Sequence, residues 1–281
     1  MIIVENIKAM TEITLGGKTL TTPSTTTQRI SLLLWGSSGS GKTTLASTAP
    51  GKKLWINFDP DGISAISNRE DVVVLDLSNE PNNAVMKFRS ENPLSLDKFL
   101  IENPDIETVV FDSLTTFGEK ALVHGVEVAK TTAKGKYATL EDPGFAGYGN
   151  KNTWTHSCVR ELLKVTGKHN RHMIFIAHED KPQVNDQGAV LYISIMLGSS
   201  LNEQIPVKLS EIWNLSDTGK ERRIAVRACR GRKPMKSRMF KTSKEPEFLW
   251  NYNAEELTGD GISEWFKQWQ DAGGSKIELP K

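Results

Sequence analysis

The residues best suited to chemistry form one glycine-rich run, GSSGSGKT at residues 36–43. Backbone N–H groups hold a dense anion best when no side chain obstructs them, so these glycines favour a loop that cradles phosphates. Lys42 would reach the β- and γ-phosphates, and the Thr43 hydroxyl would bind Mg²⁺. The sequence therefore predicts a nucleoside triphosphate site made by Gly36, Ser37, Ser38, Gly39, Ser40, Gly41, Lys42, Thr43 and Thr44.

A carboxylate suited to the same metal ion follows an apolar run at residues 108–111. Asp112 stands where this expected strand ends. Ligands of open α/β sheets bind beyond the carboxyl ends of the strands, so we expect Asp112 on a strand neighbouring the phosphate loop and interpret it as a magnesium residue. The alternative is that Asp112 only caps the next helix, although Ser113 is the more usual capping residue.

Two other strand ends carry polar side chains that could act on an attacking water molecule. Asp59 and Asp61 follow the expected strand 53–58, and Asp59 is the preferred residue to orient or deprotonate that water. The alternative is a simple turn, because the residue types of Asp-Pro-Asp-Gly suit one. His178 follows the expected strand 173–177 and is interpreted as a γ-phosphate sensor, with a solvated loop histidine as the alternative.

These residues need a scaffold that brings strand ends together. Short β-rich apolar runs alternate with helical patterns, which indicates an α/β fold with a mainly parallel sheet flanked by helices. Two late strands flank the turn Asp217-Thr218-Gly219 and predict an antiparallel hairpin that extends the sheet. The expected strands are residues 30–35, 53–58, 72–75, 107–111, 173–177, 210–215 and 222–228, and the expected helices are residues 42–47, 95–102, 114–128, 152–168 and 262–269.

The same patterns divide the chain into three parts. Residues 1–28 end in a linker-like run of Thr, Ser and Pro and predict an arm outside the core. Residues 29–245 form the expected core, and residues 246–281 form a C-terminal extension with a short closing helix. Inside the core, residues 130–151 lose helical periodicity and collect Gly, Lys and aromatic residues.

Composition limits the class of protein. The chain is 38% hydrophobic and 25% charged, as is ordinary for a globular protein, and no apolar run reaches the roughly 18 residues that span a bilayer. The N-terminus shows no signal-peptide pattern, and Cys158 and Cys229 lack metal-type spacing, which favours free thiols in a reducing cytoplasm. The net charge is +1, yet residues 220–244 contain eleven Lys or Arg and one acidic residue. This stretch favours a localised anionic partner such as nucleic acid or a neighbour's triphosphate.

The order of these features resembles the RecA core: a phosphate loop after the first strand, an acid after the second, a magnesium carboxylate after the fourth and a polar residue after the fifth. Within that superfamily, GSSGSGKTTLAST (36–48), VVFDSLT (109–115) and IAHE (176–179) are most similar to the phage Sak-type single-strand annealing proteins. The resemblance covers residues 30–245, with Asp59 where the family usually has glutamate. It implies a magnesium-dependent ATPase that acts on single-stranded DNA in the bacterial cytoplasm and assembles as a ring or filament. A single-strand DNA-binding protein is a further implied partner.

The resemblance also implies roles for two arginines and for a loop. RecA-type proteins place two basic residues, separated by one position, where they reach the nucleotide of the next subunit, and Arg230 and Arg232 match that spacing. The alternative is a solvated basic hairpin. Single-stranded DNA would bind to the irregular stretch 130–151, where cations alternate with rings that stack on bases; the alternative is a mobile surface loop. The expected DNA-binding residues are Lys134, Lys136, Tyr137, Phe145, Tyr148 and Lys151, and a second loop at 181–200 is a weaker candidate.

Two other functions also use a phosphate loop. A small-molecule or nucleotide kinase would need an arginine-rich mobile lid soon after the third strand, which the sequence lacks, and it leaves the hairpin-rich tail unexplained. A P-loop protein can instead use ATP as a structural switch while it assembles with a replication partner. Phosphorylation of an acceptor would identify the kinase, and slow, DNA-insensitive hydrolysis with a specific protein partner would identify the switch.

Overall fold

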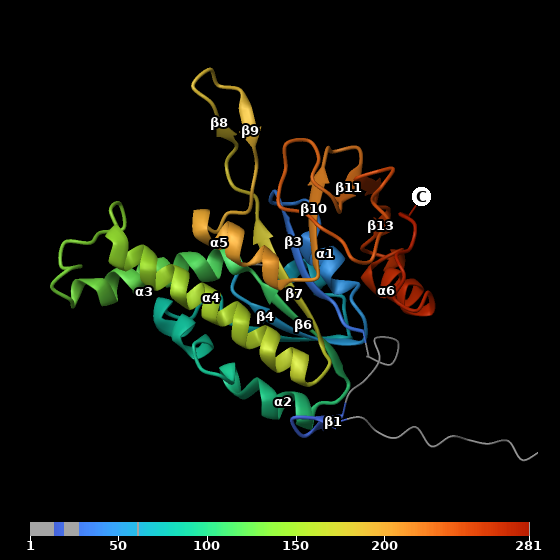
Figure 1. Cartoon of the computed structure of the whole chain (residues 1–281), viewed down its shortest axis with the longest axis horizontal. Helices are drawn as coiled ribbons and strands as arrows, with labels where there is room; N and C mark the ends of the chain where they lie inside the picture. The colour runs from blue at the N-terminus through green and yellow to red at the C-terminus, as the bar shows by residue number, and fades with distance from the viewer. Residues whose placement is uncertain (1–13, 20–27, 61, 281) are drawn as a thin grey trace, which may run out of the picture.

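The computed structural model describes residues 14–19, 28–60 and 62–280, and within them eight strands form one central sheet (Figure 1). Asp61 and most of the expected N-terminal arm lie outside the described residues. The spatial order of the strands is β12 (Glu247–Leu249), β11 (Arg222–Ala225), β10 (Glu211–Asp217), β3 (Ser31–Gly36), β7 (His172–His178), β6 (Ile106–Asp112), β4 (Lys52–Asn57) and β5 (Val72–Asp76).

The sheet is mainly parallel. All pairings from β10 across to β5 are parallel, whereas β11 and β12 join antiparallel at the other end. The α/β fold class expected from the sequence, with a mainly parallel sheet flanked by helices, is confirmed, and so is the hairpin of β10 and β11 that extends the sheet. Parallel strands place their carboxyl ends at one edge, so the loops that follow β3, β4, β6 and β7 gather there.

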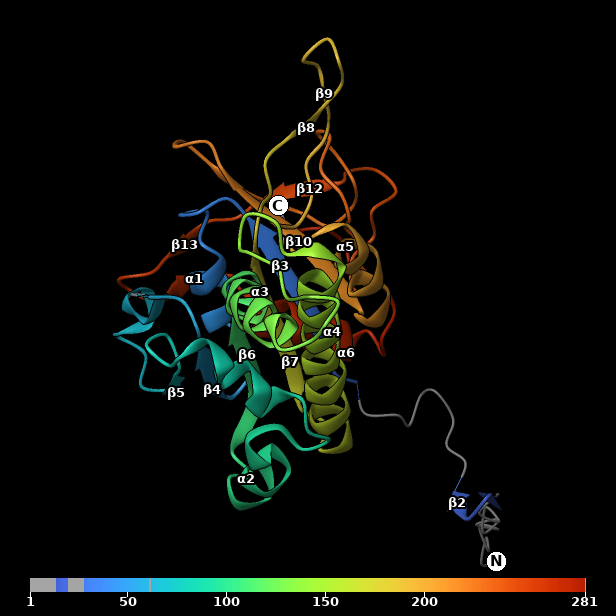
Figure 2. The ribbon, with the colours of Figure 1, turned by 90° about the vertical axis from the view of Figure 1, so that its left-hand side faces the viewer.

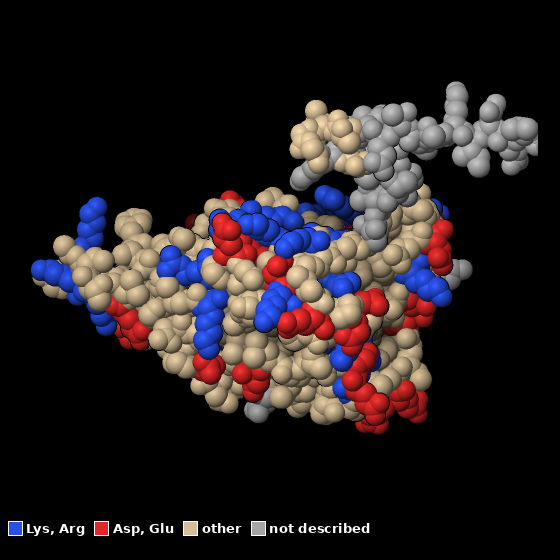
Figure 3. Space-filling model, turned by 90° about the horizontal axis from the view of Figure 1, so that it is seen from below, with Lys and Arg blue, Asp and Glu red and all other residues tan. Residues whose placement is uncertain are grey.

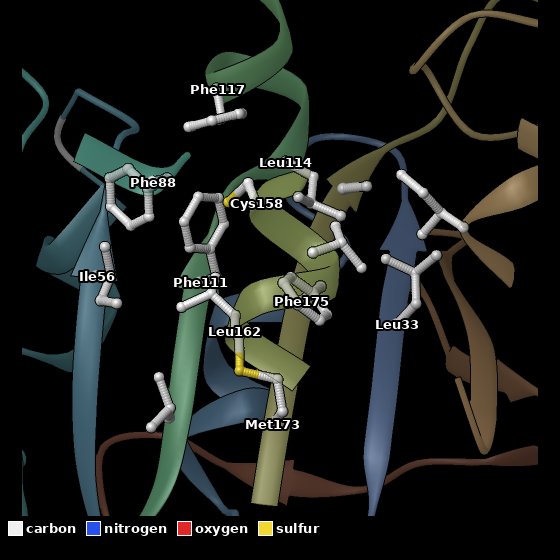
Figure 4. Close-up of a cluster of buried hydrophobic side chains, with 14 of the residues drawn as sticks. Leu33, Ile56, Phe88, Phe111, Leu114, Phe117, Cys158, Leu162, Met173 and Phe175 are labelled. Atoms are coloured by element: carbon white, nitrogen blue, oxygen red, sulfur yellow. The ribbon is translucent and has the colours of Figure 1, made fainter. Parts of the chain in front are cut away.

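Helices cover both faces of the sheet, because the central strands are buried on both sides. Alternate residues of β3 show this: Leu33 and Trp35 enter one apolar core with α3 and α4, whereas Leu32 and Leu34 enter a second core with α1 and α6. Figure 4 shows the first core, in which Phe88, Phe111 and Phe117 meet edge to face. The helices are α1 (Lys42–Ser47), α2 (Leu96–Glu102), α3 (Leu114–Lys130), α4 (Gly144–Lys168), α5 (Ser199–Gln204) and α6 (Ile262–Asp271).

Helix α4 begins at Gly144, eight residues before the start expected at Asn152. The sequence pattern does not predict this first part as helix, because glycines are poor helix formers and leave no apolar stripe. Here they serve close packing against α3: a Cβ on Gly125 would lie 3.0 Å from the carbonyl oxygen of Gly147, and Asn150 donates a hydrogen bond to the carbonyl oxygen of Gly125 at 3.0 Å. The contact between the two helices therefore overrides the weak local propensity.

The C-terminal segment contributes to the main fold. β12 lies beyond the boundary expected at residue 245, yet it pairs with β11 in the central sheet. Trp250 and Trp265 are 3% and 1% exposed and pack in the second core with α1. Residues 246–281 therefore complete one face of the sheet as well as carrying the closing helix α6.

Small elements decorate this body. The hairpin of β8 (Gln183–Val184) and β9 (Val190–Tyr192), hereafter the β8–β9 arm, stands away from the sheet in two perpendicular views (Figures 1 and 2). The other small elements are β1 (Thr14–Leu15), β2 (Lys18–Thr19), β13 (Tyr252–Asn253), β14 (Thr258–Gly259), η2 (Gly62–Ile66), η3 (Asn82–Phe88), η4 (Pro93–Ser95) and η5 (Pro206–Lys208). Within the described part of the chain, no helix combines the length and apolar character needed to cross a membrane.

A buried histidine links the start of the sheet to α6. The imidazole of His172 is 7% exposed, accepts a hydrogen bond from the Ile30 N–H at Nδ1 (3.2 Å) and meets the ring of Phe266 edge to face at 4.5 Å. Burial lowers the pKa of His172 to about 4, and the charges of Arg29 and Arg171 act in the same direction. The folded protein thus holds this imidazole neutral with Nδ1 as the acceptor.

We predict that His172 makes folding sensitive to mild acid. Between pH 6.5 and pH 4 the unfolded chain binds a proton at this residue that the folded chain does not, so stability is full above pH 6.5 and falls as the pH drops to 4. The loss approaches about 3 kcal/mol. In His172→Asn the amide oxygen can accept the same hydrogen bond, but it does not titrate. The free energy of unfolding of this variant should therefore fall less between pH 7 and pH 4 than that of the wild type. Urea unfolding of both proteins at pH 7 and pH 4 measures this, and equal losses would contradict the prediction.

Candidate active site

The phosphate loop joins the buried strand β3 to α1. Gly39 and Gly41 adopt positive φ angles of 75° and 94°, which other residues rarely adopt. Gly36 is required for another reason, because a Cβ there would lie 2.1 Å from the carbonyl oxygen of Leu215 on the neighbouring strand β10. The glycines are therefore demanded by the loop conformation and by the strand packed behind it, as the sequence predicts for a loop whose backbone faces a ligand.

Polar groups of this loop suit a bound triphosphate. The Lys42 ammonium is 5% exposed and donates to the carbonyl oxygens of Gly36 (3.1 Å) and Ser37 (2.7 Å). Burial lowers the pKa of Lys42, and the carboxylates of Asp112 and Asp59 partly offset that effect. The hydroxyl of Ser40 is buried without a hydrogen-bond partner among the described residues. A buried cation held only by carbonyls and an unpaired hydroxyl both fit phosphate oxygens as additional partners.

Thr43 and Asp112 meet as the sequence predicts for a magnesium site. The Thr43 hydroxyl donates to the Asp112 carboxylate at 3.2 Å, and Asp112 is 2% exposed. Burial and the charge of Asp59 raise the pKa of Asp112 to about 7, although the bond from Thr43 acts in the opposite direction. A divalent cation at this pair would favour the ionised carboxylate. The expectation of a directly neighbouring strand is wrong, because β7 lies between β3 and β6.

The structure brings Asp59 and His178 together, although they follow different strands. The Asp59 carboxylate lies 3.2 Å from Nε2 of His178 and also accepts hydrogen bonds from the hydroxyls of Ser113, at 2.9 Å, and Thr116. Burial acts to raise the pKa of Asp59, but the hydrogen bonds from His178, Thr116 and Ser113 outweigh it and hold the pKa below its usual value. Asp59 is therefore an ionised, firmly oriented carboxylate beside the imidazole.

Glu179 belongs to this site but was given no role by the sequence analysis. Its N–H donates to the carbonyl oxygen of Gly36 at 3.0 Å, so its backbone lies against the start of the phosphate loop. Its carboxylate, 15% exposed, accepts two bonds from the Arg232 guanidinium at 2.9 and 3.2 Å. The available signal was its position directly after His178 at a strand end. Thr115 was also missed, and its hydroxyl accepts the N–H of His178 at 2.9 Å.

Comparison with known proteins identifies the family of this chain. The family model described as an AAA domain matches residues 28–249. The chain belongs to this AAA domain family. The crystal structure of the RadB recombinase is similar with a TM-score of 0.47 and 13% sequence identity, over 80% of this chain and 88% of that one. No curated protein matches the chain.

The two arginines expected to act on a neighbour's nucleotide pair within this AAA domain. Arg232 bonds to Glu179, and Arg230 donates to Glu247 at 2.6 Å. Other cations of the 220–244 stretch also have internal partners: Arg222 pairs with Asp217, Arg223 with Glu221 and Glu247, and Lys241 with Glu278. Five of the eleven cations in this stretch are thus paired with carboxylates. A role toward another subunit would require Arg230 and Arg232 to exchange these partners.

Of the six expected DNA-binding residues, Lys134, Lys136 and Tyr137 lie in the connection between α3 and α4, and Phe145 and Tyr148 lie in the first turns of α4. Phe145 is fully exposed, Tyr137 is 82% exposed, and the Lys136 ammonium lies 4.6 Å from the Tyr137 ring. Figure 3 shows this connection at the left end, with projecting cations and acidic side chains close to them, and the rest of that face also mixes both signs of charge. Lys151 lies apart, half-buried on α4, where its side chain approaches Gly118 and Gly198 and burial lowers its pKa. We name Lys134, Lys136, Tyr137, Phe145 and Tyr148 the α3–α4 tip.

The other candidate loop forms the β8–β9 arm. Its exposed side chains include Val184, Val190 and Leu191, which are more than half exposed, and Lys181 begins it. Tyr192 stacks under the Lys233 ammonium at 4.2 Å, which joins the arm to the basic stretch. The arm thus exposes both apolar and polar side chains, and Lys181 is the one cation in residues 181–192.

We predict that Glu179 and Arg232 stabilise the fold as a coupled pair. Both are largely shielded from water and form two parallel bonds, so the coupling energy should be about 1–2 kcal/mol. Urea unfolding of Glu179→Gln, Arg232→Gln and the double variant measures it through a double-mutant cycle. The exposed pair Lys52–Asp105, with side chains 39% and 57% exposed, is the matched control and should couple by less than about 1 kcal/mol. Equal couplings would show that the Glu179 pair has no special shielding.

Proposed function

We propose that this AAA domain binds ATP with Mg²⁺, hydrolyses it and acts on single-stranded DNA in phage-type recombination or annealing. The supporting observation is the convergence of Lys42, Thr43, Asp112, Asp59 and His178 at the carboxyl edge of one parallel sheet. Basic, carboxylate and imidazole groups then surround the place where a terminal phosphate would lie. The choice of ATP and of single-stranded DNA rests on the resemblance to Sak-type annealing proteins.

Each residue of the site has a distinct task in this proposal. Lys42 binds oxygens of the β- and γ-phosphates, replacing the carbonyls of Gly36 and Ser37 as its partners. Thr43 and Asp112 hold Mg²⁺, with phosphate oxygens and water as its remaining ligands. When bound, the metal neutralises charge on the phosphates. Asp59 orients the attacking water, and His178, bonded to Asp59, senses whether the γ-phosphate is present.

The proposal includes assembly as a ring or filament in the cytoplasm, with a single-strand DNA-binding protein as a further partner. In such an assembly Arg230 and Arg232 would reach the nucleotide of the adjacent subunit. The planar guanidinium of Arg232 binds both carboxylate oxygens of Glu179. It could bind two oxygens of a phosphate in the same geometry, which suits this task. If Arg232 left Glu179 to bind a phosphate of the adjacent subunit's nucleotide, the nucleotide state would be coupled to assembly.

We predict that Lys42 and Asp59 separate binding from hydrolysis. Lys42→Ala should abolish both, because the phosphates lose their cation. Asp59→Asn should retain nucleotide affinity within about threefold but hydrolyse at least about a hundredfold more slowly, since the amide neither carries the charge nor accepts a proton. Fluorescent-nucleotide titration and phosphate release, with and without single-stranded DNA, measure the two quantities. Asp105→Asn, on the exposed pair with Lys52, is the control.

Two outcomes would contradict these roles. Full hydrolysis by Asp59→Asn would remove Asp59 from the chemistry. Unchanged turnover together with unchanged nucleotide-dependent DNA binding by His178→Ala would remove the sensor role from His178.

We predict that the α3–α4 tip binds single-stranded DNA by charge and by stacking. For the double variant Lys134→Ala/Lys136→Ala, a plot of log binding constant against log salt concentration should be less steep by about 1.4. This is the change expected when two phosphate contacts are lost. Tyr137→Ala and Phe145→Ala should each weaken binding by about 1–3 kcal/mol without changing that slope. The control is Lys87→Ala/Lys98→Ala, two exposed lysines elsewhere.

Oligonucleotide binding measured by fluorescence anisotropy at several salt concentrations tests these expectations. The same loss in the control variant, or an affinity that does not depend on salt, would contradict DNA binding at the tip.

A further inference from the structure

The catalytic groups lie on one side of the phosphate loop. Their position indicates on which side the terminal phosphate of a bound nucleotide would lie. Asp112, Asp59 and His178 follow β6, β4 and β7, and all three strands lie on the same side of β3. The terminal phosphate and its metal therefore belong on that side. β10, β11 and β13 lie on the opposite side of β3 (Figure 1), so the nucleoside end of the molecule points toward them.

A cleft of 1010 Å³ opens on that opposite side, between the β10–β11 turn and residues 249–259. It adjoins the phosphate loop directly: a Cβ on Gly41 would lie 3.1 Å from the Trp250 ring and 3.8 Å from the Arg222 side chain. Glycine at position 41 is thus needed for the approach of the cleft wall as well as for its positive φ. The side chains of Trp250 and Arg222, which line the cleft, therefore lie against the phosphate loop.

The walls of the cleft suit a flat heterocycle joined to a sugar. Trp250 and Tyr252 stack with centroids 5.8 Å apart and planes 13° apart, and the buried Trp250 is fixed by a hydrogen bond to the Asp260 carbonyl oxygen at 3.0 Å. Tyr252 is half-exposed, and the Arg222 guanidinium is held by Asp217 at 3.1 Å. An aromatic ring and a guanidinium both stack on nucleobases. Asn251 and Asn253 supply amides at the rim, which match ribose hydroxyls.

The apolar pocket beside β5 is a less suitable place for this ligand. Its volume is 310 Å³, and its lining is aliphatic and aromatic throughout, with Leu54, Val73 and Phe99 among the residues. β5 is also the edge strand farthest from β3 in this direction. A nucleoside there would bury its polar atoms without partners.

We propose that the cleft between the β10–β11 turn and residues 249–259 is the nucleoside subsite, in which Arg222 and Tyr252 stack on the base of the bound triphosphate. The inference rests on the proposed nucleotide binding and adds the residues that recognise everything beyond the phosphates. The C-terminal segment is thereby part of the ligand site.

Comparison of ATP with inorganic tripolyphosphate tests the subsite separately from the phosphate loop. Wild-type protein should bind ATP at least about tenfold more tightly than tripolyphosphate, because only ATP fills the cleft. Arg222→Ala and Tyr252→Ala should each weaken ATP binding about tenfold and change tripolyphosphate binding less than about twofold. Arg227→Ala and Tyr192→Ala, an arginine and a tyrosine outside the cleft lining, are the matched controls and should leave both affinities unchanged.

Photolabelling provides a readout that does not depend on substitutions. An azidoadenine nucleotide should label the tryptic peptide of residues 245–267, which contains Trp250 and Tyr252 and has no internal Lys or Arg. Labelling confined to other peptides, equal affinities of wild type for ATP and tripolyphosphate, or ATP affinities unchanged in both cleft variants would overturn the subsite. Binding of neither ligand by wild type would instead overturn the proposed nucleotide binding, and the subsite with it.

Discussion

The parallel register of four central strands is the constraint on which the site depends. Gly36 lies opposite His178 across β3 and β7, and Asp112 lies opposite Asn57 across β6 and β4. A slip of one residue would turn the side chains of His178, Asp112 and Asn57 to the other face of the sheet. The two apolar cores prevent such a slip, because alternate residues of the same strands are committed to opposite faces. Packing of the cores thus sets the relative positions of residues that are up to 142 positions apart in the chain.

Much of this site could be predicted from sequence, because strand ends are local signals and parallel topology brings them together. Thr43, Asp112, Asp59 and His178 were each inferred from the segment that precedes them, and their mutual contacts follow from the sheet. Partnerships across the fold could not be predicted in this way. Nothing near residue 232 in the sequence indicates that its guanidinium binds Glu179, so the stretch 220–244 gives a stronger impression of free positive charge than the structure supports.

The start of α4 illustrates a different limit. Sequence patterns report apolar periodicity and propensity, and residues 144–151 have little of either. Their helical state depends on a second helix, since Gly125 of α3 and Gly147 of α4 allow backbones to meet where side chains would separate them. The α3–α4 pair and the connection between the two helices extend away from the sheet (Figure 1). The glycines that weaken the prediction of a helix are therefore the residues that allow the two helices to pack closely and extend outward.

The electrostatics of the site favour a ligand that brings a metal ion. Asp112 and Asp59 are close enough that the charge of one raises the pKa of the other, yet their surroundings differ: Asp59 has three donors, whereas Asp112 has Thr43 and the nearby charge of Lys42. Proton uptake by Asp112 is one way to relieve the repulsion between the two carboxylates, and added positive charge is another. A divalent cation at Asp112 would supply that charge and remove the conflict. In the proposed function the cation would arrive with the triphosphate, and Lys42 would balance part of the phosphate charge.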